Sequence, residues 1–223
     1  MCRHLAAIAV SAAAAVAVFA LPPAAHAAAR PAIRTYTERA DAAFTGIGSN
    51  KGYSSATSGS EKVVLGPRLV VAADWRDAYE LHGAHSSSGQ VDIIGDRKYV
   101  RNGNSQWTAS TLSARALRSW TGDLNPYATL AKFDALHGAR RTGTGHFQVT
   151  GTYKQVGSFV VFEFGLTADS FKGSGIETLT ISMTLDSSGR PVRITAVGRS
   201  STTAFTATET FARYNKPVTI DVP

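Results

Sequence analysis

The chain has 223 residues, of which 43% are hydrophobic and 17% are charged, and it carries a formal net charge of +7. This composition supplies a sizeable core and excludes a disordered chain. The basic residues are scattered rather than gathered in a stripe with aromatic residues, so nucleic acid is not an expected partner. Weak attraction to anionic lipid headgroups or wall polymers is the expected consequence of the positive charge.

The first 27 residues have the pattern of a secretory signal peptide. Arg3 gives a short positive start, Leu5–Leu21 is almost entirely apolar, and Ala25-His26-Ala27 places small residues at a cleavage position. The alternative is a membrane anchor, but a spanning helix needs about 20 residues. We therefore expect cleavage after Ala27, leaving residues 28–223 as a single domain outside the cytoplasmic membrane.

The only cysteine is Cys2, which lies inside the predicted signal peptide. The mature chain is therefore expected to have no disulfide, no thiolate nucleophile and no sulfur ligand for a metal. Cys2 also lies before the apolar run, whereas a lipid-anchor cysteine would follow it. The sequence predicts a secreted protein without a lipid anchor.

The elements of the first half are predicted in chain order from periodicity. A short helix is expected at about Tyr36–Phe44, ending at the pair Gly46 and Gly48. Hydrophobic alternation then predicts several strands, separated by turns rich in glycine, serine and aspartate. These strands are expected at 52–60, 68–75, 78–85, 90–95 and 98–101.

The middle of the chain has helical spacing instead. Residues 111–121 place Leu112, Leu117 and Trp120 at roughly helical intervals. A second helix is predicted after Asn125, whose side chain can cap it, with Pro126 at the first helical position and Gly138 as the stop.

The period returns to two in the C-terminal part of the chain. In the hairpin at 181–196, apolar Ile181, Met183 and Leu185 alternate with polar residues. Six strands are expected here, at 144–153, 158–168, 177–186, 190–199, 203–214 and 217–222. The predicted fold class is α+β: a strongly curved antiparallel half-open β-barrel of about eleven strands, with helices as a lid.

Three stretches of the chain resemble the LppX/LprG group of actinobacterial lipid-binding proteins, whose fold is similar to that of LolA and LolB. They are "GDRKYVRNGNSQWT", "NPYATLAKFDALHGARRTGTGHFQVTGTY", and a C-terminal part that includes "MTLDSSGRPVRITAVGR" and "KPVTIDVP". The resemblance covers roughly residues 36–223. It implies a half-open barrel over an apolar cavity and a role in carrying lipids or lipoproteins. The chain departs from that group in having no cysteine to lipidate after the signal peptide.

The function predicted from these observations is a non-catalytic carrier or binding protein for a lipid or lipidated molecule, with possible peripheral contact with a membrane surface. A curled sheet can enclose more space than its own side chains fill, and an apolar wall would then hold the ligand. A charged inward surface would count against this hypothesis. The alternatives are plain core packing at each position and an extracellular interaction or sensor module with a filled interior. The candidate wall residues are Val160, Phe162, Phe164, Leu166, Ile181, Met183 and Leu185, and the candidate lid residues are Leu117, Trp120, Leu130 and Phe133.

Catalytic and metal-binding patterns are weak in this sequence. His82 and His85 are three residues apart in a predicted strand or loop, and on a strand this spacing points them to opposite faces. Glu163 and Glu177 are isolated carboxylates, whereas a glycosidase requires two that converge. No nucleophile elbow or phosphate loop is present. We therefore expect no enzyme, no metal and no cofactor, with an extracellular hydrolase as the third hypothesis.

Overall fold

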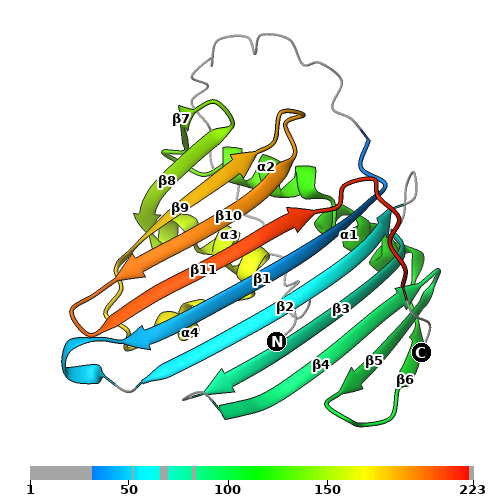
Figure 1. Cartoon of the computed structure of the whole chain (residues 1–223), viewed down its shortest axis with the longest axis horizontal. Helices are drawn as coiled ribbons and strands as arrows, with labels where there is room; N and C mark the ends of the chain where they lie inside the picture. The colour runs from blue at the N-terminus through cyan, green and yellow to red at the C-terminus, as the bar shows by residue number, and fades with distance from the viewer. Residues whose placement is uncertain (1–31, 52, 66–69, 82–83, 221–223) are drawn as a thin grey trace.

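A single antiparallel sheet contains all the strands of the described chain, and the four α-helices lie on one of its faces (Figure 1). The computed structural model describes residues 32–51, 53–65, 70–81 and 84–220, so the predicted signal peptide lies outside the described residues. The sheet has eleven strands in the order β6-β5-β4-β3-β2-β1-β11-β10-β9-β8-β7. Both ends of the chain's folded part therefore meet in the middle of the sheet, where β1 pairs with β11.

In one half of the sheet, β1 to β6, each strand pairs with the next one in the chain. The same holds for the other half, β7 to β11, and the two halves are joined where β11 pairs with β1. The strands are β1 (Thr35–Gly46), β2 (Ser54–Leu65), β3 (Val70–Leu81), β4 (Ala84–Ile94), β5 (Arg97–Asn102), β6 (Thr108–Thr111), β7 (Arg140–Gly143), β8 (His146–Thr152), β9 (Thr178–Leu185), β10 (Pro191–Arg199) and β11 (Thr203–Ala212). The helices are α1 (Ala114–Asp123), α2 (Pro126–Asp134), α3 (Tyr153–Phe164) and α4 (Ala168–Phe171), with a 3-10 turn η1 (Gly48–Asn50).

The sheet has an inner face, covered by the helices, and an outer face. Helix α3 contacts β1, β9 and β11, α2 contacts β10, and α1 contacts β3. The core lies between these layers, where Val149, Ile181, Met183 and Ile194 are at most 1% exposed. Because successive side chains of a strand point to opposite faces, the intervening residues of the same strands lie on the outer face.

The predicted helix at Tyr36–Phe44 is wrong, because these residues form β1. The buried residues Tyr36, Glu38, Ala42 and Phe44 alternate with more exposed neighbours, which is the period of a strand. Pairing with β2 on one side and β11 on the other satisfies the backbone of β1. Tertiary pairing therefore overrides the weak helical preference of its alanines.

The predicted strand at 158–168 is also wrong, because residues 153–164 form helix α3. The Thr152 hydroxyl and the Gln155 side chain form a capping box at its start, and Gly165 ends it in the left-handed conformation. Burial of Val156, Phe159, Val160 and Glu163 follows the three-four spacing of a helix. Val160, Phe162 and Phe164 have the alternating spacing of a strand because apolar residues also lie on both sides of the buried face of α3.

Two further predictions about strands need correction. The segments 68–75 and 78–85 were predicted as two strands, but Val70–Leu81 is one continuous strand, and the predicted turn at 86–89 lies within β4. Residues 217–220 are not in a strand, although 217–222 were predicted as one. The eleven strands of the described chain are thus not the eleven predicted segments. The α+β class with mostly antiparallel strands is confirmed.

The second predicted helix is confirmed as α2. The Asn125 side chain accepts a hydrogen bond from the Tyr127 backbone amide at 3.0 Å, and Pro126 occupies the first helical position. The helix ends at Asp134, before the predicted stop at Gly138, which instead has a positive φ of 83° in the following turn. Within the described chain, no helix has the length and apolar character needed to cross a membrane.

Candidate functional site

Nine of the eleven predicted wall and lid residues belong to one hydrophobic core or pack against it, the other two being Phe162 and Trp120. Ile181 and Met183 point to the inner face from β9, with Leu185 half-buried beside them. Leu117 of α1, Leu130 and Phe133 of α2 are buried on the helix side, and Phe133 packs edge-on against Phe159 at 5.5 Å between ring centroids. The structure therefore brings the predicted wall and lid together between the sheet and the helices.

The other wall candidates lie in helix α3 or, for Leu166, just after it, instead of in the predicted strand. Val160 and Leu166 are buried, whereas Phe162 and Phe164 are half-buried on the flanks of α3. Phe162 lies under the Lys132 ammonium, whose nitrogen is 3.4 Å from the ring centroid. The backbone of Trp120 lies in α1, but its side chain is outside the described ones.

Two aromatic clusters close the inner face along β1. At one end Phe44 and Phe205 pack against Phe171 of α4, with ring centroids 4.8–5.1 Å apart. At the other end Tyr36 packs near Phe211 and Tyr214. The Tyr36 hydroxyl also donates a hydrogen bond to the Leu124 carbonyl, which ties β1 to the loop between α1 and α2.

Between the two aromatic clusters the inner face carries small side chains, in a section that we call the middle section. Ala40 lies opposite Gly59, Ala42 opposite Thr57, and both alanines also face β11. Ala40, Thr57 and Gly59 are only half-buried, although each lies in a strand with partners on both sides. The helices therefore cover this section less completely than they cover β9 and β10.

Four glutamates between the sheet and the helices are buried, and their grouping is not predicted from the sequence. Glu38 of β1 pairs directly with Glu61 of β2, and Glu209 of β11 lies diagonally across from Glu38. Glu163 enters from α3, and both Glu163 and Glu209 are at most 1% exposed. One signal was available in the sequence. Glu209 lies four residues after Phe205 and two before Phe211, and residues an even number of positions apart in a strand point to the same face. The inward surface is thus partly acidic, which counts against the predicted carrier with a cavity lined by hydrocarbon alone.

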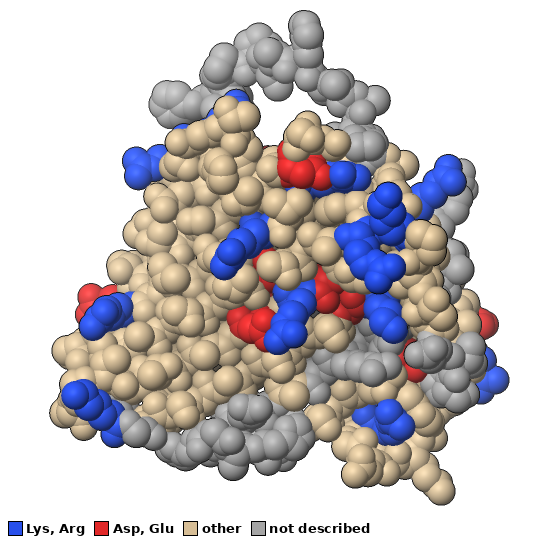
Figure 2. Space-filling view, viewed as in Figure 1, with Lys and Arg blue, Asp and Glu red and all other residues tan. Residues whose placement is uncertain are grey.

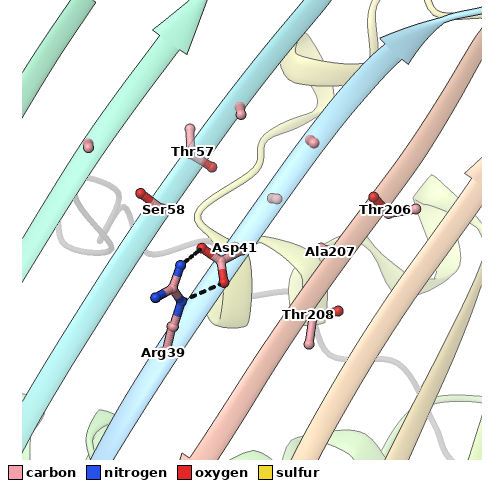
Figure 3. A pocket seen from close by; sticks show the side chains of 11 residues that line it. Arg39, Asp41, Thr57, Ser58, Thr206, Ala207 and Thr208 are labelled. Atoms are coloured by element: carbon pink, nitrogen blue, oxygen red, sulfur yellow. Dashed lines mark hydrogen bonds and ion pairs between the residues drawn. The ribbon is translucent and has the colours of Figure 1, made fainter. Parts of the chain in front are cut away.

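The outer face has a hollow of about 460 Å³ over the central strands. Figure 3 shows its polar end, where Arg39 and Asp41 lie side by side on β1. The Asp41 carboxylate accepts hydrogen bonds from Arg39 Nε at 2.8 Å and Arg39 Nη2 at 3.1 Å. Small residues of β1, β2, β3 and β11 line the rest of the hollow: the outward-facing Ala43, Ala56, Ser58, Ala78, Thr206 and Thr208, together with Ala42, Thr57 and Ala207.

Metal ligands do not gather in the described part of the chain, where no group of three or more histidine, cysteine or acidic side chains is arranged to hold an ion. The side chains of His82 and His85 lie outside the described ones. Glu177 is exposed just before β9, on a different element from Glu163. His146 begins β8, where its Nδ1 lies 3.3 Å from the Thr184 hydroxyl.

Comparison with solved structures gives a distant structural likeness. No family model and no curated protein matches the chain. Among solved structures, the chain is similar to a beta-barrel-like protein of the domain of unknown function DUF1849 from Brucella abortus, with 10% sequence identity and a TM-score of 0.22. The match covers 82% of this chain and 98% of that protein.

Proposed function

We propose that the protein is an exported, non-catalytic binding protein that holds a small amphipathic ligand in a half-open barrel. The ligand would lie between α3 and the middle section of the inner face. The proposal is supported mainly by the half-buried state of Ala40, Thr57 and Gly59 on an otherwise deeply buried face. Inward-facing residues of central strands are normally covered by a core, and we therefore assign the ligand to this less covered section.

The chemistry of the inner face suggests a ligand with two parts. The aromatic and aliphatic side chains at both ends favour an apolar body, whose burial contributes about 0.8 kcal/mol per methylene group. The buried glutamates favour a polar part that donates hydrogen bonds or carries positive charge. A fatty acid anion is disfavoured, because its carboxylate would approach Glu38 and Glu209.

The proposal is tested by filling the middle section. In the Ala40→Leu variant a large side chain enters the space assigned to the ligand, so we expect the co-purified ligand to be lost. Native mass spectrometry of protein purified from its own host would detect the ligand as added mass. A fluorescent amphipathic amine would give the affinity in a second measurement, and we expect Ala40→Leu to weaken it at least tenfold.

Ala43→Leu is the matched control, since Ala43 lies in the same strand and points to the outer face. It should leave the ligand and the fluorescent amine bound. Stability gives an independent readout: a leucine that enters free space costs little, whereas overpacking a filled core costs about 1–3 kcal/mol. Wild-type protein without added mass, together with a strongly destabilised Ala40→Leu variant, would refute the proposal.

A second candidate is an extracellular interaction or sensor module with a filled interior. It is favoured by the core beneath α2 and α3, where Phe133, Phe159, Ile181 and Met183 are at most 1% exposed. Such packing leaves that half of the inner face without room for a ligand unless the helices move. The same Ala40→Leu experiment separates the two candidates, because only the carrier loses a bound molecule.

A further inference from the structure

A row of basic residues crosses the outer face perpendicular to the strands. Starting from β8, every second strand contributes a basic residue at the same level of the pairing register: His146, Arg193, Arg39, Arg76 and Arg101, of which the Arg76 side chain lies outside the described ones. The strands that lie between these five carry polar residues at the same level, namely Thr184, Thr210, Ser60 and Gln90. All nine positions follow from the pairing register of the strands. We call this set the arginine row. No two of its basic residues are neighbours in the sequence, so only the sheet creates it.

The spacing of the row is set by the sheet. Adjacent strands lie about 4.8 Å apart, so bases on alternate strands repeat at about 10 Å. Arg193 and Arg39 are exposed, and the Arg39 side chain is 69% exposed despite its ion pair. Because Asp41 accepts from Nε and Nη2, it leaves the Nη1 edge of the guanidinium available for another acceptor.

The end of the row at β5 has a fixed geometry. Arg101 stacks over the Trp107 ring at 4.7 Å and donates from Nη2 to the Gln90 side chain at 2.8 Å. Figure 2 shows lysine and arginine side chains gathered over the central strands of this face, with acidic side chains among them. One of the acids beside the row, Asp92, is only 1% exposed, and its carboxylate lies 3.3–3.5 Å from the Gln90 amide nitrogen.

The hollow adjoins the row at Arg39. Its walls are alanine methyl groups and the hydroxyls of Ser58, Thr206 and Thr208, and Asp41 stands at its edge. A guanidinium next to a carboxylate and hydroxyls can pair with both an acidic group and the hydroxyls of a sugar ring. A volume of about 460 Å³ lies within the usual range for a small-molecule site.

We propose that the outer face binds an extended acidic polysaccharide that runs along the arginine row, with one sugar ring in the hollow. The repeat of bases at about 10 Å, with hydroxyl side chains between His146, Arg193 and Arg39, fits a polymer that carries an acidic group on every second sugar. A membrane fits less well, because bilayer binding combines a broad basic patch with inserted apolar side chains. The described large hydrophobic side chains with clear exposure are Tyr53, Val161 and Val197, and only Val197 belongs to a strand.

The test uses hyaluronate, which has one carboxylate per disaccharide, with dextran as the uncharged polymer. We expect purified wild-type protein to bind hyaluronate and not dextran in isothermal titration calorimetry, and the affinity to fall as salt is raised. In Arg39→Gln/Arg193→Gln two bases of the row lose their charge while both side chains keep hydrogen-bonding groups. We expect this double variant to bind hyaluronate at least tenfold more weakly and with a smaller salt dependence.

The matched control is Arg115→Gln/Lys154→Gln, which removes the same charge from exposed positions of α1 and α3 on the other side of the sheet. It should bind hyaluronate within twofold of the wild type. Equal losses in both double variants would show that net charge alone attracts the polymer and would overturn the proposal. Tighter binding to phosphatidylglycerol vesicles or to a single-stranded oligonucleotide than to hyaluronate would overturn it as well. Thermal unfolding is measured for each variant, and a midpoint equal to that of the wild type confirms that the variant is folded.

Discussion

At the scale of single residues, the best-defined polar contact is in the turn between β9 and β10. Asp186 accepts hydrogen bonds from the backbone amides of Ser188 and Arg190, and from the Arg190 guanidinium at 2.7–2.8 Å. Partial burial would raise the pKa of the carboxyl, but the hydrogen bonds and the charge of Arg190 outweigh it and hold this pKa below its ordinary value of 3.8. The ionised carboxylate therefore stabilises the folded chain.

We expect Asp186→Asn to lower the free energy of unfolding by about 1 kcal/mol at pH 7. A lowered pKa stabilises the fold above the unfolded pKa and loses this effect as the pH falls through the folded value. The difference between variant and wild type should therefore shrink progressively below about pH 4. Urea unfolding at several pH values measures it. Asp96→Asn, in an exposed turn, serves as the control, and a difference independent of pH would contradict the assignment.

At the scale of elements, the helices are defined by their caps more than by their apolar pattern. The cap of α2 is visible in the sequence as Asn125 before Pro126, and the structure confirms it. The capping box of α3, Thr152 with Gln155, is equally local, but a run of apolar residues with apparent alternation obscured it. A short apolar run fits both periods, so its ends have to decide between helix and strand.

The cap of α2 can be measured directly. Asn125→Ala removes the acceptor for the Tyr127 amide, and we expect a loss of about 1 kcal/mol in the free energy of unfolding. Asn125→Asp keeps an acceptor and adds a negative charge at the helix N-terminus, so it should retain the wild-type stability or exceed it slightly. Chemical denaturation of both variants tests this, and equal destabilisation would show that the cap is unimportant.

At the scale of the whole molecule, the ends of the described chain are fastened together. The Asn215 side chain accepts a hydrogen bond from the Arg34 backbone amide and donates one to the Ala32 carbonyl. The backbone amide of Asn215 donates a third hydrogen bond to the Thr35 carbonyl. Tyr214 donates a hydrogen bond from its hydroxyl to the Pro191 carbonyl, and its ring lies beneath Arg190. These contacts fix the segment that follows β11 against the start of β1.

Asn215 has a positive φ of 57°, which most residues disfavour. We expect Asn215→Ala to cost about 2 kcal/mol in the free energy of unfolding, because it loses two side-chain hydrogen bonds and strains the backbone. Asn215→Gly relieves the strain and should cost only about 1 kcal/mol. Thermal or urea unfolding distinguishes the two, and identical costs would show that the backbone conformation contributes little.

Two features depend only on neighbouring residues and are predictable from the sequence: the period of β9 and β10 and the capped start of α2. The apolar residues that meet in the core are also evident in the sequence. That residues 35–46 form a central strand depends on long-range pairing, because their backbone is satisfied by β2 and by β11, about 170 residues further along the chain. The same long-range pairing groups Glu38 with Glu209 and aligns Arg39 with Arg193. Strand register places such residues side by side, and register between distant segments leaves no trace in local sequence.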